Sequence, residues 1–345
     1  MLYVTTRDAR DAYTAYRALS ENRCPEGGFF VPMHLPYYGE NEIAALADKC
    51  FSQNVAEILN HFFGSHLDGR SLELGTGRYP VKIHSLNSRT LVAECWHNPV
   101  YHFERLVHGI EKALRQSDRI SKQPSDWLVI ASRIAVLFGV VGQLLQDGTF
   151  SPTQKLDIAL PSGNFSAPMA AWYARAMGLP VGTIICCCNE NTALWNLFHK
   201  GQLPTGATAV RTHTPQNDYA VPEDLERLIF SALGRQEAER FCQICRLGGN
   251  YLLEYEQLKR LRDGMQIRVI SDKRTASTIP NLYKSTGIVA DPDTALAYSG
   301  LMDYRAAAGE SRMALLLSEQ SPLFSQQFVS ACMNITPAEL KQILD

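Results

Sequence analysis

The sequence has little of what marks secreted, membrane-bound or nucleic-acid-binding proteins. Its formal net charge is only −2, so charge gives no reason to expect nucleic acid or an anionic membrane as a partner. Its first residues, 1–13, lack the basic-then-apolar pattern of a signal peptide. Hydrophobic residues make up 46% and charged residues 20%, as in ordinary globular proteins. We therefore expect a soluble protein of the cytoplasm.

Long apolar runs are also scarce. The longest one, residues 128–145, is interrupted by Ser132, Arg133 and Gln143. Polar side chains in such a run favour a buried helix over a membrane span.

The nine cysteines do not suggest a disulfide framework, because they are scattered and odd in number. Cys242 and Cys245 form a single CxxC pair without a second pair or nearby histidines, so we expect helix packing there and no metal site. Residues 186–188 end an apolar run that reads as a buried strand, in which cysteine acts as a small hydrophobe.

Strands and helices alternate from about residue 128 onward, which predicts an open, mostly parallel sheet covered on both faces. Before that point, helical spacing covers residues 41–63 and 103–116, a short strand covers residues 90–96, and residues 117–126 read as a linker. The strands predicted in the second half are residues 156–160, 181–188, 267–270 and 313–317. The helices predicted there are residues 128–146, 164–177, 192–199, 223–233 and 275–285.

One turn in this pattern is suited to an anion. Residues 161–166 (PSGNFS) join an apolar strand to a helix, so backbone N–H groups and the helix N-terminus converge there. An ordinary strand-to-helix turn, with Ser162 or Asn164 capping the helix, explains the same residues. A small anionic ligand is thus one of two open interpretations.

Motifs along most of the chain resemble those of threonine synthases. The matching segments are YVTTRD (3–8), CPEGGFFVP (24–32), LPSGNF (160–165), CNEN (188–191), TPQND (214–218), VPEDLER (221–227), ISD (270–272) and DPDTA (291–295). The resemblance implies a three-layer α/β fold of the pyridoxal-phosphate (PLP) fold type II. It also implies an N-terminal α+β domain at residues 1–80 and a core domain at residues 81–345. The family activity is that of a PLP-dependent carbon–oxygen lyase of amino-acid biosynthesis, acting on phosphohomoserine.

The resemblance breaks where the cofactor should be held. The family's Schiff-base lysine aligns with Glu104, while His97, Pro99 and Phe103 keep the register. A carboxylate can neither form the imine nor shuttle protons in the same way. Lys112 lies about 12 Å further along the helix axis, too far to take over.

A second departure is larger. The family's small mobile domain, with its SGDTG loop, has no counterpart in the sequence, and the helix near residue 116 leads through the linker into residues 126–145. The lid that excludes water would then be gone. The newly exposed cleft is a reason to expect self-association or a protein partner.

Two more positions differ from the family. Ser166 replaces the second glycine of the phosphate loop, which otherwise matches at Ser162, Gly163, Asn164 and Phe165. Glu319 takes the place of the threonine that faces the pyridine nitrogen. We expect no covalent cofactor, although PLP or another phosphorylated ligand bound non-covalently fits the same loop.

These departures favour a pseudoenzyme, a threonine-synthase-like protein that binds a ligand or a partner. A different enzyme in the same pocket is the alternative, with Glu104, His97, His102 and Glu319 as an acid–base cluster. An active threonine synthase or related lyase would require the alignment at Glu104 to be wrong.

Overall fold

A six-stranded sheet forms the centre of the molecule, in a computed structural model that describes residues 1–7, 12–76, 81–96, 102–116, 123–309 and 312–345. The strand order is β10-β7-β6-β11-β5-β4. All neighbours are parallel except β4 and β5, which pair antiparallel at the edge. The strands are β4 (Lys82–Asn87), β5 (Thr90–Glu94), β6 (Leu156–Pro161), β7 (Val181–Cys188), β10 (Met265–Val269) and β11 (Ala314–Ser318).

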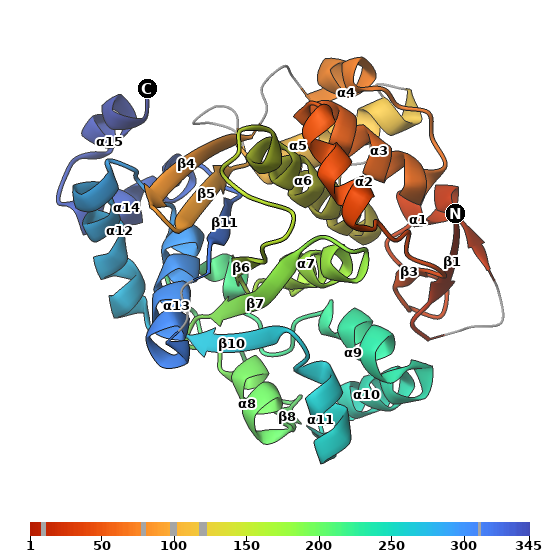
Figure 1. The fold of residues 1–345 in the computed structure, drawn as a ribbon. Helices are drawn as coiled ribbons and strands as arrows, with labels where there is room; N and C mark the ends of the chain where they lie inside the picture. Colours follow the sequence, from red (N-terminus) through yellow and green to blue (C-terminus); the bar gives the residue numbers. More distant parts are fainter. Residues whose placement is uncertain (8–11, 77–80, 97–101, 117–122, 310–311) are drawn as a thin grey trace.

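The central strands are buried on both faces, as the apolar runs predict. Alternate residues point to opposite faces of the sheet, so Ile158 and Leu160 of β6 join one core cluster while Ala159 joins another. The same alternation divides Cys186 and Cys188 from Cys187 on β7. The helices α6 (Asp126–Gln146) and α7 (Ser166–Ala176) cover the first face, and α13 (Pro292–Ala308) covers the second (Figure 1).

The other elements surround this three-layer centre. A sheet of order β2-β1-β3 lies near the N-terminus and a β8-β9 pair lies near α8 and α11 (Figure 1). The minor strands are β1 (Leu2–Thr5), β2 (Tyr13–Thr14), β3 (Phe30–Pro32), β8 (Gln202–Pro204) and β9 (Asn250–Leu252). The N-terminal helices are α1 (Ala15–Ser20), α2 (Glu40–Ala44), η1 (Ala45–Asp48), α3 (Phe51–Phe63), α4 (Gly69–Thr76) and α5 (Phe103–Arg115). The later helices are α8 (Ala193–Lys200), η2 (Pro215–Asn217), α9 (Leu225–Leu233), α10 (Arg235–Leu247), α11 (Tyr255–Leu261), α12 (Asp272–Thr286), η3 (Pro322–Ser325), α14 (Gln326–Met333) and α15 (Pro337–Leu344).

The N-terminal elements share a core with the central sheet. Trp127 of α6 is fully buried, donates from Nε1 to the Tyr3 hydroxyl at 2.9 Å, and lies edge-on to Phe62 of α3. The Tyr3 hydroxyl in turn donates to the Phe62 carbonyl at 2.7 Å. One continuous apolar cluster therefore runs across residue 80, where the sequence predicts a domain boundary. That boundary stays a prediction.

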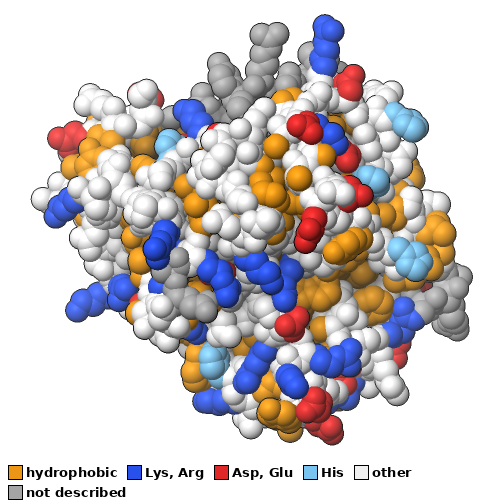
Figure 2. Space-filling view, in the orientation of Figure 1, with side chains coloured by type: hydrophobic (Ala, Val, Ile, Leu, Met, Phe, Trp, Pro, Cys, Tyr) orange, Lys and Arg blue, Asp and Glu red, His pale blue; other side chains and the backbone are white. Residues whose placement is uncertain are grey.

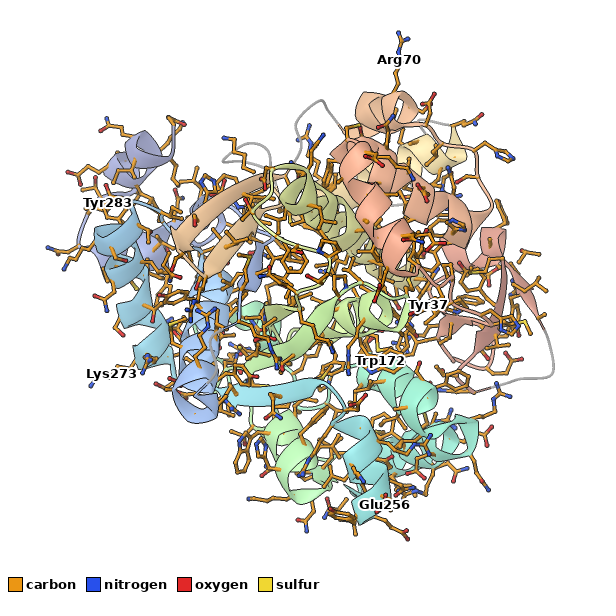
Figure 3. The ribbon with its side chains drawn as sticks, viewed as in Figure 1. Tyr37, Arg70, Trp172, Glu256, Lys273 and Tyr283 are labelled. Carbon is orange, nitrogen blue, oxygen red and sulfur yellow. The ribbon has the colours of Figure 1, made fainter. Side chains whose placement is uncertain are left out.

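The surface carries charged side chains of both signs. Acidic and basic side chains are interspersed over the face shown in Figure 2, in keeping with the small net charge. Arg70 of α4 and Lys273 of α12 extend away from the body of the molecule (Figure 3). The long helix α6 is the one described helix whose length and hydropathy would allow a membrane span, and 78% of its apolar window is buried inside the protein. The prediction of a buried core helix is confirmed.

Most elements predicted from the sequence are found within a few residues of their expected bounds. The fold class, a mostly parallel sheet flanked by helices, is confirmed. The antiparallel edge strand β4 and the long helix α13 were not predicted. Residues 117–122 of the expected linker lie outside the described residues.

Close packing of α6 against the N-terminal helices gives a test of the shared core. At Gly142 an added Cβ would lie 2.3 Å from the Asn54 side chain and 3.1 Å from the Leu46 carbonyl oxygen. We expect Gly142→Ala to lower the free energy of unfolding by about 1–3 kcal/mol, because a backbone carbonyl cannot move aside easily. Chemical denaturation measures this, with Gln146→Ala at the exposed end of the same helix as the control. Equal stability of the two variants would contradict this packing.

Candidate functional site

A cleft next to the sheet opens at the carboxyl ends of its parallel strands, where open α/β sheets bind ligands. It has a volume of about 470 Å³. The loop after β6, the end of β11, the first turns of α5 and α13, and the inner face of α6 all contribute to its wall. A second cavity of about 230 Å³ shares five of its lining residues. The shared residues are His102, Glu104, Gln216, Asp293 and Gln320.

The loop after β6 makes a tight turn from the strand into α7. Gly163 has φ +47°, in the left-handed region that glycine adopts easily, and Phe165 has φ +76° just before α7. A non-glycine residue in this region costs about 1–3 kcal/mol. Phe165 is fully buried in the core, and this burial offsets the cost. The predicted turn is thus present. The left-handed conformation of Phe165 could not be predicted from the single glycine in the sequence.

Four of the N–H groups of this loop already have partners inside the protein. The Gly163 N–H donates to Asn217 Oδ1 at 2.7 Å, and the Ser166 N–H donates to Asn164 Oδ1 at 3.1 Å. The Ser162 and Phe165 N–H groups donate to backbone carbonyls at 2.8 Å. A phosphate would have to compete with these acceptors for its donors.

Arg133 connects the loop to the opposite wall of the cleft. Its Nη1 donates to Ser166 Oγ at 2.8 Å, while Nε and Nη2 donate to the two carboxylate oxygens of Glu319 at 2.7 Å each. The side chains of Arg133 and Glu319 are 13% and 22% exposed, and the guanidinium lies 4.9 Å from the Phe103 ring centre. This is the two-pronged geometry in which arginine binds carboxylates most strongly.

Glu104 lies in the first turn of α5 with its side chain 53% exposed. Its carboxylate is 3.6 Å from Nδ1 of His102, which precedes the helix. The two residues line both cavities. His97 lies outside the described residues. The structure therefore brings His102 and Glu104 together, but Glu319 of the predicted acid–base cluster is engaged by Arg133 instead.

Two aspartates at the start of α13 add acidic groups to the cleft. Asp291 caps this helix and accepts from the N–H groups of Asp293 and Thr294 and from the Ser318 hydroxyl. Asp293 accepts from the Asn217 amide at 2.7 Å. Burial, followed by the charge of Asp291, raises the pKa of Asp293 to about 8. Asp293 is therefore mostly protonated at neutral pH.

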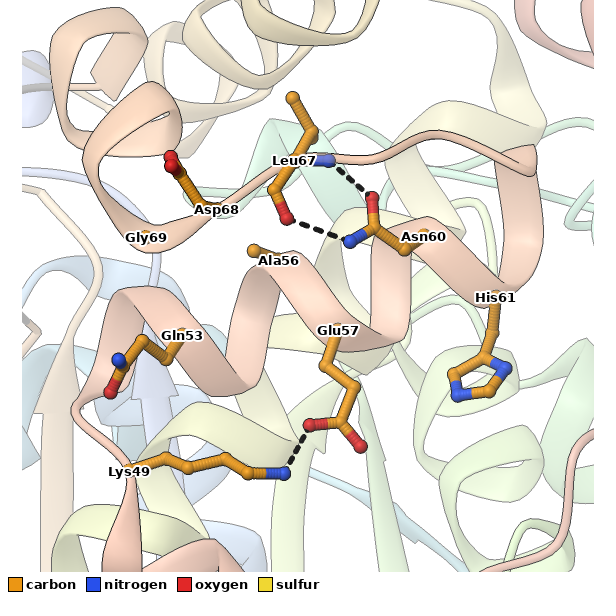
Figure 4. Close-up of a pocket in the computed structure, with 9 residues that line it drawn as sticks. All are labelled: Lys49, Gln53, Ala56, Glu57, Asn60, His61, Leu67, Asp68 and Gly69. Carbon is orange, nitrogen blue, oxygen red and sulfur yellow. Dashed lines mark hydrogen bonds and ion pairs between the residues drawn. The ribbon is translucent and has the colours of Figure 1, made fainter.

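A hollow of about 500 Å³ beside α3 and α4 is a weaker candidate (Figure 4). Its polar groups bind one another: Lys49 pairs with Glu57, and the Asn60 amide both donates to and accepts from the backbone of Leu67. We interpret it as a surface depression between the N-terminal helices and not as a binding site.

The CxxC pair lies in α10, as expected for helix packing. Burial raises the pKa of Cys242 to about 12 and that of Cys245 to about 11, so neither is a thiolate at neutral pH.

The residues present do not fit a covalently bound PLP. The position that the resemblance assigns to the lysine is Glu104, and the described lining of the cleft contains no lysine. Ser166 and Glu319, the positions expected near the phosphate and the pyridine nitrogen, are bound to the same guanidinium. The loop donors are bound internally as well. We therefore derive no chemical step through this cofactor.

Sequence reasoning missed Arg133, Asn217 and Asp293 as cleft residues. Arg133 had a visible signal, since a lone arginine within an apolar helix needs a buried partner. Asp293 belongs to the matching segment 291–295, but no role in the cleft was predicted for it from the sequence.

Parts of the sequence match threonine synthases. A family model described as "Threonine synthase N terminus" matches residues 2–76. The threonine synthase of Pseudomonas aeruginosa is 28% identical over 182 residues, which are 52% of this chain and 38% of that protein. Human threonine synthase-like 1 is 27% identical over 158 residues, which are 45% of this chain and 21% of that protein. The matches thus span well under two thirds of these relatives' own lengths.

Solved structures give the same class. The PLP-bound threonine synthase of Brucella melitensis superposes with a TM-score of 0.85 at 18% identity, over 100% of this chain and 94% of that one. The yeast threonine synthase gives 0.83 at 16% identity, over 99% and 93%. The fold is that of the fold type II PLP enzymes. By fold and by its partial sequence matches, the chain is similar to threonine synthases.

The ion pair between Arg133 and Glu319 should be strongly coupled. In a double-mutant cycle with Arg133→Met and Glu319→Gln, we expect a coupling energy of about 1–3 kcal/mol, because either single change leaves a half-buried group unpaired. The exposed pair Arg17–Glu21, with side chains 38% and 39% exposed, is the matched control and should give below about 0.5 kcal/mol. Denaturant unfolding measures both cycles. Equal coupling in the two cycles would show that the cleft pair is no stronger than a surface pair.

Proposed function

We propose that this chain is a threonine-synthase-like protein that carries out no PLP catalysis and binds a small ligand in the cleft between α5, α6 and the loop after β6. The observation that carries the proposal is the Arg133 guanidinium lying between Ser166 and Glu319. It binds the two groups that would otherwise be available to the cofactor. We place the protein in the cytoplasm, because its nine cysteines are free.

The position of Glu104 supports the proposal. Family catalysis needs an amine that holds the cofactor and moves protons, and a carboxylate cannot replace it. The connection between α5 and α6 also matters, because it runs only from residue 116 to residue 125. A small domain with a substrate loop does not fit in so short a segment.

The charges of the cleft favour a ligand that carries an ammonium group. Its described acidic lining residues are Glu104, Asp126, Asp291, Asp293 and Glu319, and Arg133 is the one Arg or Lys among the described lining. Burial also raises the pKa of Asp126 and that of Asp291, although Arg227 and Arg23 act to lower the pKa of Asp126. A cation bound beside these carboxyl groups would lower both pKa values. An ammonium ligand would supply that cation. The anionic ligand predicted from the turn draws less support, because four of the loop N–H groups already donate to acceptors of the protein.

The alternative of an acid–base enzyme in the same pocket has weaker support. Glu104 and His102 are close to each other, but Glu319 is bound by Arg133. Association with itself or with another protein also stays a prediction. Phe324, 51% exposed at the smaller cavity, is one described apolar side chain that a partner would cover.

Borohydride trapping tests the absence of PLP chemistry. The purified chain is incubated with PLP, reduced, and mapped by mass spectrometry, while orthophosphate release from phosphohomoserine is followed in parallel. We expect neither a specific reduced lysine adduct nor phosphate release above the level without protein, because no described lysine reaches the cleft. A threonine synthase of known activity is the positive control. Stoichiometric labelling of one lysine, or sustained phosphate release, would overturn the proposal.

The ligand class is tested by thermal shift with defined probes at two pH values. Putrescine, ethanolamine and L-lysine are compared with succinate and phosphoserine at pH 6.5 and 8.5. Because the pKa of Asp293 is about 8, its carboxylate forms as pH rises through that value, so amine binding should strengthen at pH 8.5. Asp293→Asn keeps an acceptor for Asn217 and should remove most of this pH dependence. Stabilisation by the anions alone would contradict an ammonium ligand.

A further inference from the structure

One guanidinium joins two groups that the family resemblance assigns to opposite ends of the cofactor. Ser166 belongs to the loop that matches the phosphate loop, and Glu319 stands where the family has the residue that faces the pyridine nitrogen. Arg133 donates to both, over distances of 2.7–2.8 Å. While the guanidinium lies there, both groups are bound to it and neither is free to bind a cofactor.

The guanidinium is held on several sides. Its three nitrogens are each bonded to Ser166 or Glu319, and the Phe103 ring lies beside it. Ser166 Oγ also donates to Asn164 Oδ1 at 2.6 Å, so the hydroxyl is oriented to accept from Arg133. The side chain comes from the middle of α6, a helix packed in the core along most of its length. Because α6 is packed in the core and Glu319 binds the guanidinium through both carboxylate oxygens, the Arg133 side chain has little freedom to move away.

We propose that Arg133 is a specificity-determining residue that excludes PLP from the cleft. We call Arg133, Ser166 and Glu319 the clamp. The inference rests on the proposed function in one respect, that the wild-type cleft holds no covalent cofactor. It goes further, because the absence of a lysine at position 104 then explains only part of why PLP does not bind. Restoring a lysine at position 104 alone would leave the clamp in place and the cofactor excluded.

The test compares two variants of the full chain after incubation with PLP and borohydride reduction. Glu104→Lys restores the amine only, whereas Glu104→Lys/Arg133→Gln/Glu319→Thr also removes the clamp charges. We expect the triple variant to carry roughly tenfold more reduced adduct at position 104 than the single variant, because the competing ion pair is gone. Peptide mass spectrometry locates and quantifies the adduct.

A second readout needs no lysine. Arg133→Gln/Glu319→Thr, with Glu104 unchanged, should bind PLP non-covalently at least about tenfold more tightly than wild type, measured by cofactor fluorescence. Removing both charges together avoids leaving either one unpaired.

The matched control for the borohydride test is Glu104→Lys/Arg175→Gln, because Arg175 pairs with Asp263 at 3.4 Å and does not line the cleft. It should behave like Glu104→Lys alone.

Circular dichroism melting shows whether each variant folds. If the triple variant does not, Glu104→Lys/Arg133→Met/Glu319→Gln gives the same comparison, since it also removes both charges and keeps the shape of Glu319. The inference is wrong if Glu104→Lys alone labels as fully as the clamp variants, or if removing the clamp leaves PLP affinity unchanged. Both outcomes differ from a failure of the proposed function, which would appear as trapping in the wild-type chain.

Discussion

The ion pair between Arg133 and Glu319 determines what the cleft is able to hold. Helix α6 carries Arg133 into the core, and a buried charge there needs a partner with matching geometry. Glu319 supplies both carboxylate oxygens from the end of β11, and Ser166 adds a third acceptor at the start of α7. One side chain thereby ties α6, α7 and the central sheet together at the place where the fold binds its ligands.

The rest of the cleft follows from this arrangement. The strand order, the bend at Gly163 and Phe165, and the packing of α6 keep the frame of a threonine synthase. The groups that would handle the cofactor are instead directed at each other. Asn217 and Asn164 accept from the loop N–H groups, and Arg133 binds Glu319. The frame is therefore similar to that of solved threonine synthases, while the described polar groups of the cleft bind one another.

The sequence predicted the strands β5, β6 and β7 well, because short apolar runs between turn residues give a strong signal. It did not predict β4, whose residues Lys82–Asn87 are only partly buried at the sheet edge. Glu104 and Glu319 were found by comparison with the family's motifs. Arg133 was not, because its partner lies 186 residues away and no local spacing connects them. Long-range polar pairs of this kind depend on the assembled fold.

The most direct test of the account is a crystal structure of the wild-type protein grown with excess PLP. The account predicts electron density for the Arg133 guanidinium between Ser166 and Glu319, with no cofactor in the cleft between α5, α6 and the loop after β6. Density for PLP in that cleft, with Arg133 turned away from Glu319, would contradict it.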